Sequence, residues 1–182
     1  MAEVEALILR SDGRCAMTTN DRAQFDAAVE WKGERELRVR ELRLEYRARP
    51  DLDMSDAYRN LATPQQAAGF LMQLLAHEAT EVFGIVCLSI THDFICWHEV
   101  ARGSLDQCHA HPREVFKAAL VANASCIVLA HNHPSGHPIP SPDDEELTRR
   151  LAASGTLLGV DVMDHIIIRD QRYYSFKEGG RL

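Results

Sequence analysis

The sequence lacks several features that mark specialised classes of protein. No apolar run approaches the roughly 18 consecutive residues of a membrane-spanning helix. No basic segment precedes the apolar part of the N-terminus, as it does in a secretory signal peptide. Basic residues do not predominate either, since 20 lysines and arginines face 27 acidic residues, for a formal net charge of -7. Because phosphate binding relies on concentrated positive charge, this balance counts against direct binding of nucleic acid.

Cysteine pairs with metal-binding or redox spacing are also absent. The 182-residue chain has five cysteines, an odd number, and no two of them form a Cys-x-x-Cys motif: Cys15, Cys87, Cys96, Cys108 and Cys126. Three of the five lie in or beside apolar runs, so we expect reduced, buried thiols rather than a disulfide framework. Without a membrane segment or disulfides, the sequence indicates a cytoplasmic protein.

The remaining composition is that of an ordinary globular domain, with 46% hydrophobic and 26% charged residues. We expect residues 1–36 to form a small N-terminal appendage, with a short strand and a helix, and residues 37–182 to form the main domain. Alternating residues over 36–50 predict an edge strand with a bulge. The arginines and glutamates of this stretch indicate a charged, solvent-exposed face, and the alternative is a docking surface for an acidic partner.

Helix and strand patterns alternate along the main domain. Prolines at positions 64, 112 and 142 mark three helix starts, two of them after the capping residues Thr63 and Ser141. The short, almost wholly apolar stretch "SCIVLAH" predicts a central strand. Four further strands are predicted, the first two as a hairpin that turns at His92-Asp93: "EVFGIVCLSIT", "FICWHEVARGS", "VDVMDHIIIRD" and "RYYSF". The order predicts an α/β (α+β) fold with a mixed sheet flanked by helices.

The stretch "HNHPSGHPIPSPDD" follows the apolar strand directly and gathers side chains that can bind metal. His131 and His133 are two residues apart, so in extended backbone their imidazoles point the same way. Asp144 falls in the first turn of the next helix, from which its carboxylate can face back. Two imidazoles, one carboxylate and a water would form the open tetrahedral zinc site used in catalysis. Each residue alone is more often structural, but the combination at the end of a buried strand favours a metal site.

The same residues resemble a known signature. His131-x-His133-Pro134, followed after six residues by Ser141 and after two more by Asp144, resembles the JAMM motif of the JAB/MPN superfamily. The text from His111 to Ile168 resembles the RadC branch of that superfamily, and the resemblance extends over roughly residues 37–182. It implies a JAB/MPN, cytidine-deaminase-like fold.

The resemblance also implies a role for each motif residue. His131, His133 and Asp144 match the zinc ligands of the family, and Ser141 matches the serine that helps to polarise the scissile carbonyl or to steady the tetrahedral intermediate. An upstream glutamate in a Glu-x-x-Gly pattern acts as the proton acceptor, and "EVFG" supplies Glu81. Glu78 is the rival three residues earlier, but it falls at the predicted end of a helix.

These roles imply a zinc-dependent metallopeptidase that cleaves a peptide or isopeptide bond in a protein or peptide substrate, of which ubiquitin-like tails are one class. The alternative is a RadC-type binding module of DNA-repair or mobile-element complexes that keeps the metal without proteolysis. A metal-dependent nuclease is disfavoured, because such sites usually recruit more carboxylates or a second metal. Residues 1–60 show no helix-hairpin-helix motif of the longer RadC relatives, which weakens an inherited role on DNA.

Other histidines could imitate the ligands. His109-x-His111 repeats the spacing, but it precedes a helix without a matching acid, so His111 is interpreted as a helix entry. His137 is expected to be an exposed loop residue. Asp164-His165 opens a late strand, where ordinary packing is favoured over support of a zinc ligand.

Overall fold

A computed structural model describes residue 46 and residues 56–103, 110–134 and 136–182. The predicted appendage over residues 1–36 lies outside the described residues, as does all of the predicted strand over 36–50 except Tyr46. His109 and Cys108 lie outside them as well.

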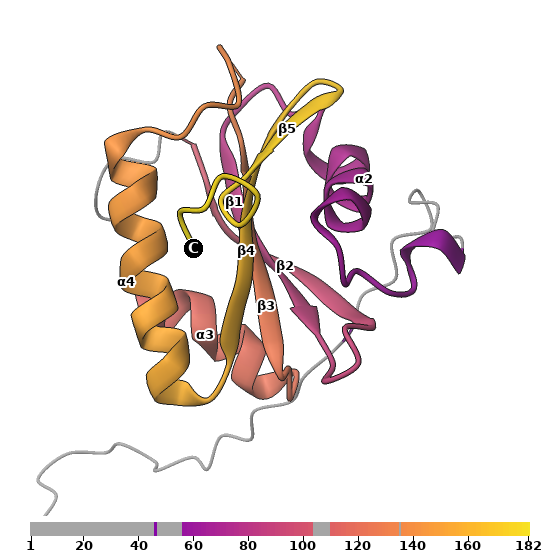
Figure 1. Ribbon diagram of the computed structural model, residues 1–182, viewed down its shortest axis with the longest axis vertical. Helices are drawn as coiled ribbons and strands as arrows, with labels where there is room; N and C mark the ends of the chain where they lie inside the picture. Colours follow the sequence, from indigo (N-terminus) through magenta and orange to yellow (C-terminus); the bar gives the residue numbers. More distant parts are fainter. Residues whose placement is uncertain (1–45, 47–55, 104–109, 135) are drawn as a thin grey trace, which may run out of the picture. The chain divides into compact units, whose positions relative to one another are not determined.

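A five-stranded mixed sheet forms the centre of the domain, with strand order β2-β1-β3-β4-β5 (Figure 1). β1 (Val82–Leu88) and β2 (Phe94–Arg102) form the predicted antiparallel hairpin, whose turn contains His92 in the left-handed region at φ 62°. β3 (Cys126–Asn132) is antiparallel to β1 and parallel to β4 (Asp161–Arg169), which pairs with β5 (Arg172–Ser175). Every residue of β3 is buried, so the prediction of a central strand is confirmed.

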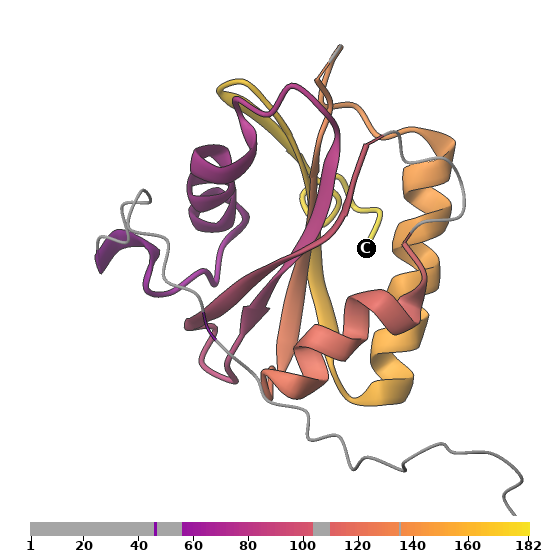
Figure 2. The same ribbon diagram turned by 180° about the vertical axis from the view of Figure 1, so that it is seen from behind.

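Helices cover both faces of the sheet in the described part of the chain. α2 (Pro64–Leu75) lies on one face, whereas α3 (Pro112–Val121) and α4 (Pro142–Leu158) lie on the other (Figures 1 and 2). A short 3-10 helix, η1 (Asp56–Tyr58), precedes α2. Two cores result, one between α2 and the sheet and the other between the sheet and the α3–α4 pair. The predicted mixed sheet with flanking helices is confirmed.

The helix starts follow from the residues that precede the prolines. Thr63, His111 and Ser141 are the N-caps of α2, α3 and α4, and the side chain of each accepts a hydrogen bond from a backbone N–H of the first turn. Gly159 is the C-cap of α4, and its φ of 70° lies in the left-handed region that favours glycine. The chain can therefore turn at once into β4, which pairs in parallel beside β3.

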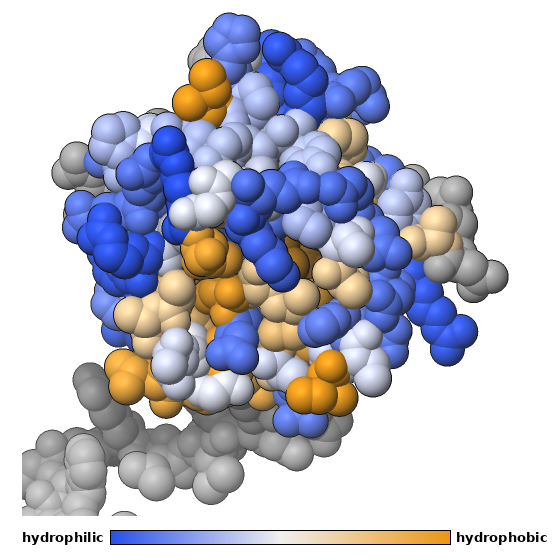
Figure 3. Space-filling view, viewed as in Figure 1, coloured by the Kyte–Doolittle hydropathy of each residue, from blue (hydrophilic) through white to orange (hydrophobic). Residues whose placement is uncertain are grey.

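The two ends of the sheet differ in character. The hydrophilic residues in Figure 3 dominate the end at which β3 finishes, whereas apolar side chains show mainly in the middle and at the opposite end. Exposed leucines and a valine belong to the last turns of α3 and α4 there: Leu120, Val121, Leu157 and Leu158. No helix in the described ranges is long and apolar enough to cross a membrane.

Candidate metal centre

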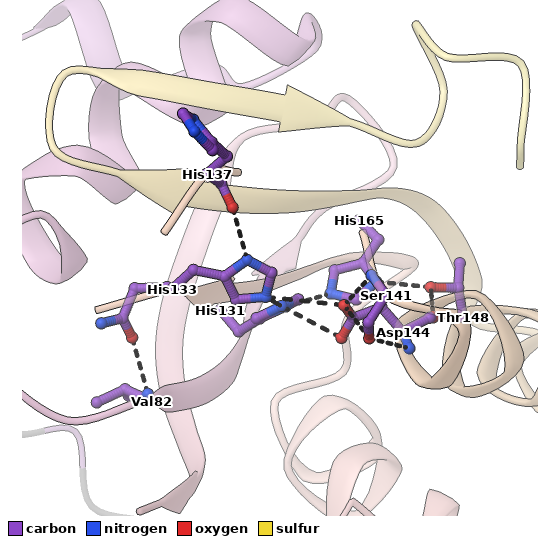
Figure 4. Close-up of polar contacts among 9 residues, drawn as sticks. Val82, His131, His133, His137, Ser141, Asp144, Thr148 and His165 are labelled. Atoms are coloured by element: carbon purple, nitrogen blue, oxygen red, sulfur yellow. Dashed lines mark hydrogen bonds and ion pairs between the residues drawn. The ribbon is translucent and has the colours of Figure 1, made fainter. Parts of the chain in front are cut away.

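The predicted metal ligands meet where β3 ends (Figure 4). His131 is the last residue but one of β3 and is fully buried, and His133 follows the strand with a side chain that is 20% exposed. Asp144 is buried in the first turn of α4. The loop of prolines and glycine between them thus joins a strand end to a helix start, as the sequence predicts.

Three potential ligand side chains face one another across this point. The two histidine Nε2 atoms lie 3.0 Å apart, and Asp144 Oδ1 lies 3.3 Å from Nε2 of His131. Asp144 Oδ2 lies 3.7 Å from Nε2 of His133. Two imidazoles and one carboxylate are the donor set of open zinc sites. The chemistry and the convergence of these residues therefore fit a divalent metal ion such as zinc.

Glu81 reaches the same place from a different strand. It precedes β1 directly and is half-buried. One of its carboxylate oxygens and one ring nitrogen of each histidine, His131 and His133, all lie within 4.8 Å of one another. Two carboxylates, of Glu81 and Asp144, therefore approach the same pair of imidazoles.

Burial keeps the inner imidazoles uncharged. Burial lowers the pKa of His131 to about 4, an effect that the Asp144 carboxylate opposes and His133 reinforces. Burial also holds the pKa of His165 well below its usual value. A neutral imidazole is the form that binds a metal ion. His133 donates from Nδ1 to the His137 carbonyl over 2.9 Å, which leaves the lone pair of its neutral form on Nε2.

Comparison with known proteins places this arrangement in a family. The family model of the RadC-like JAB domain matches residues 61–181, which include all of the motif residues. The chain belongs to the RadC-like JAB domain family. The matched region spans the five strands and the helices α2, α3 and α4, so the fold agrees with a JAB/MPN-like architecture.

The chain is also similar to curated relatives that carry the name "UPF0758 protein". It is 43% identical to one of Caldanaerobacter subterraneus over 66% of this chain and 52% of that protein. It is 47% identical to one of Bacillus licheniformis over 65% of this chain and 53% of that protein. It is 42% identical to one of Ralstonia nicotianae over 74% of this chain and 61% of that protein. The chain therefore spans about half the length of most of these relatives, and their name states no activity.

Ser141 contacts Asp144 in this RadC-like JAB domain. Its hydroxyl donates to Asp144 Oδ2 over 2.7 Å, and its backbone N–H donates to the same oxygen over 2.7 Å. In return, the backbone N–H of Asp144 donates to Ser141 Oγ over 3.2 Å, which completes a capping box. These bonds hold Oδ2 and leave Oδ1 directed at His131. The predicted role of Ser141 at a scissile carbonyl stays a prediction, because it requires the hydroxyl to turn away from Asp144.

Asn132 is a residue of this RadC-like JAB domain that the sequence reasoning missed. Its buried side chain accepts a hydrogen bond from Val82 N over 2.8 Å and donates to the carbonyls of Thr80 (3.0 Å) and Glu78 (3.2 Å). The amide thereby fixes the backbone on both sides of Glu81. One signal was available, because a buried amide in an apolar strand must find partners.

The packing around Gly84 explains why the Glu-x-x-Gly pattern has a glycine at this position of the RadC-like JAB domain. A Cβ at Gly84 would lie 2.4 Å from the Trp97 ring and 2.6 Å from the His98 carbonyl oxygen of β2. The glycine therefore permits the close packing of Trp97 across β1, the strand that begins beside Glu81.

The other candidate residues, Glu78, His111 and His137, have structural partners or exposed positions of their own. Glu78, the rival of Glu81, forms an ion pair with Arg102 at 2.5 Å, and Arg102 also binds Glu99. His111 is a helix entry and His137 is exposed, as predicted.

Asp164 accepts hydrogen bonds from the Ser175 hydroxyl and from Lys177 N, which is a structural arrangement. His165 is packed as expected, since it is fully buried and stacks on Phe176. Its Nε2 also lies 2.9 Å from Nδ1 of His131, and support of a zinc ligand by His165 stays a prediction.

Proposed function

We propose that this chain is a zinc-dependent metallopeptidase that hydrolyses a peptide or isopeptide bond. One observation carries the proposal: the Nε2 atoms of His131 and His133 lie 3.0 Å apart between two carboxylates from different elements. Asp144 on α4 supplies one, and Glu81 before β1 supplies the other. A metal site with a second, separately held carboxylate is suited to hydrolysis, because that group can move a proton.

His131, His133 and Asp144 would hold the ion. When bound, zinc supplies Lewis-acid chemistry, since it polarises a carbonyl group and makes a water molecule more acidic. Glu81 accepts the proton of the water that attacks the carbonyl carbon. It then delivers this proton to the nitrogen of the leaving amine. Ser141 holds Oδ2 of Asp144 and, once its hydroxyl turns, donates to the oxygen of the tetrahedral intermediate.

Glu81 has an alternative role that an experiment can separate. The distances allow it to be a fourth ligand, which would close the site and favour a structural metal. Glu81→Gln keeps the shape of the side chain and removes its basic oxygen. If Glu81 is the proton acceptor, the variant keeps its zinc and loses hydrolysis. If Glu81 is a ligand, the variant loses zinc.

The proposed substrate is a protein or peptide, and the resemblance to JAMM proteins makes ubiquitin-like tails the first class to try. Zinc-loaded protein would be incubated with a mixed peptide library and with an isopeptide-linked ubiquitin dimer, and new amino groups would be measured by mass spectrometry. We expect cleavage by the wild type and at least 100-fold less by Glu81→Gln. Glu78→Gln is the matched control, because it removes the rival carboxylate three residues away, and it should keep wild-type cleavage.

Two results would overturn the proposal. Equal cleavage by Glu81→Gln and the wild type would remove Glu81 from the mechanism. A fully zinc-loaded wild type that cleaves neither substrate set would favour the alternative, a metal-containing binding module without proteolysis. The net charge of -7 leaves proteins rather than bare nucleic acid as the partners of such a module.

A further inference from the structure

His165 on β4 lies beside the ring of His131, on its Nδ1 side (Figure 4). Its Nε2 is 2.9 Å from Nδ1 of His131, and its Nδ1 is 2.6 Å from Oγ1 of Thr148 on α4. Thr148 Oγ1 in turn lies 2.6 Å from the carbonyl oxygen of Asp144, one helical turn earlier. Thus a continuous chain of hydrogen bonds runs from the backbone of one candidate ligand to the ring of another.

The hydrogen bond to the Asp144 carbonyl fixes which group donates in each of the other hydrogen bonds of this series. Two oxygens 2.6 Å apart require a proton between them, so the single hydroxyl proton of Thr148 is donated to the Asp144 carbonyl. His165 must therefore donate from Nδ1 to Thr148. A neutral imidazole carries one ring proton, so Nε2 of His165 accepts, and His131 donates to it from Nδ1. The lone pair of His131 is then on Nε2, the atom that faces His133 and Asp144.

We propose that Thr148 and His165 are positioning residues that lock His131 in the tautomer able to bind metal. The inference rests on the metal-binding part of the proposed function and is independent of proteolysis. It also explains why a threonine stands one turn after Asp144: the hydroxyl connects α4, which carries Asp144, with β3, which carries His131. Histidine ligands of metal sites are commonly oriented by such a partner on the second ring nitrogen.

The surroundings of His165 keep this arrangement rigid. His165 and Thr148 are 0% and 1% exposed, so water does not compete for their hydrogen bonds. The His165 ring stacks on Phe176 at 4.8 Å with an interplanar angle of 13°, and it meets Phe83 edge-on at 6.0 Å. Two aromatic contacts at right angles leave the ring little room to rotate or flip.

Thr148→Val is the sharpest test, because valine keeps the shape of threonine and removes the hydroxyl. Thr156→Val is the matched control: Thr156 lies on the same helix and donates to the carbonyl of Ala152, also four residues earlier, but its hydroxyl forms no hydrogen bond with a described histidine. Thr148→Ser restores the hydroxyl. The primary measurement is the ring tautomer of His131 in metal-free protein, from long-range ¹H–¹⁵N spectra assigned with His131→Gln. The second is zinc affinity by competition with a chromophoric chelator.

The wild type, Thr156→Val and Thr148→Ser should show a proton on Nδ1 of His131. Thr148→Val should show a mixture of tautomers and about 10- to 100-fold weaker zinc binding. A wild-type proton on Nε2 would overturn the inference, as would unchanged tautomer and affinity in Thr148→Val. The wild-type spectrum decides the matter even if Thr148→Val does not fold. If the wild type binds no zinc, the proposed function fails, while the tautomer still decides this inference.

Discussion

The side-chain oxygen of Asn132 accepts a hydrogen bond from the backbone N–H of Val82 over 2.8 Å. The residue between the two candidate ligand histidines therefore fixes the strand that begins immediately after Glu81. Side chains alternate along a strand, so His131 and His133 face the candidate metal centre, whereas Asn132 faces the other side and binds the backbone around Glu81. One tripeptide thus relates the candidate metal ligands to the candidate proton acceptor.

We expect Asn132→Asp to displace Glu81, the candidate proton acceptor, from the candidate metal ligands. The variant replaces the amide that donates to the carbonyls of Thr80 and Glu78 with a group of equal size that repels them. Stability should fall by about 1–3 kcal/mol. Cleavage should fall more than tenfold at saturating zinc, because Glu81 is displaced. Both are measured on one preparation, by chemical denaturation and by the cleavage assay.

Asn60→Asp is the control for that variant. Asn60 also donates from its amide to a backbone carbonyl, that of Thr91, and accepts from Ala62 N, but it bridges a different pair of segments. Its substitution should lower stability without lowering cleavage at saturating zinc. Equal losses of cleavage in the two variants would reduce the role of Asn132 to general stability.

The two capping boxes of the fold allow a second comparison. Ser141→Ala and Thr63→Ala each remove an N-cap hydroxyl, so both should destabilise the protein by about 1 kcal/mol. Only Ser141 also binds the carboxylate of a candidate ligand, Asp144 Oδ2. Zinc affinity should therefore fall in Ser141→Ala and stay unchanged in Thr63→Ala, as measured by chelator competition. Equal affinities would show that the cap does not orient Asp144.

Gly84→Ala should destabilise the protein by about 1–3 kcal/mol through overpacking. The new Cβ would meet both a Trp97 ring atom at 2.4 Å and a backbone oxygen at 2.6 Å, and the backbone cannot move aside cheaply. Gly69→Ala on α2 is the control, since its Cβ would meet only the Tyr58 side chain, at 3.3 Å. Thermal unfolding of the two variants should differ clearly. A harmless Gly84→Ala would contradict the account of the Glu-x-x-Gly pattern.

Metal-free protein should lose stability as the pH falls from about 6.5 to 4. Burial lowers the pKa of His131 to about 4 and that of His165 in the same direction, whereas both groups titrate near 6.5 in the unfolded chain. Within that window the unfolded chain binds more protons, so His131 lowers the free energy of unfolding by up to about 1.4 kcal/mol per pH unit, and His165 acts in the same direction.

Denaturation in a chelating buffer at several pH values measures this slope. His165→Gln should reduce it, because this variant removes one buried imidazole. A slope that is the same in the wild type and in His165→Gln would show that the buried imidazole of His165 does not control acid stability.

Local rules of sequence were enough to find the helix starts and the cluster of four motif residues. Proline after a capping residue fixes where α2 and α4 begin, and the spacing of His131, His133 and Asp144 is set by one strand end and one helix start. Glu81 could be found because Gly84 follows it at the spacing of the family pattern.

The partners of the site could not be found in this way. His165 and Thr148 meet His131 only because β4 pairs in parallel with β3 and α4 packs across them, and no local pattern encodes that register. The partners of Asn132 lie about fifty residues earlier in the chain, so the need for a partner was predictable but its identity was not.

The metal content of the purified protein tests the central claim most directly. Wild-type protein, prepared without chelators and dialysed against trace zinc, would be analysed by elemental mass spectrometry beside His131→Ala, His133→Ala and Glu81→Gln. The account predicts one zinc per chain in the wild type and in Glu81→Gln, and little or none in the two histidine variants. A wild-type protein that binds no zinc, or histidine variants that bind as much as the wild type, would contradict it.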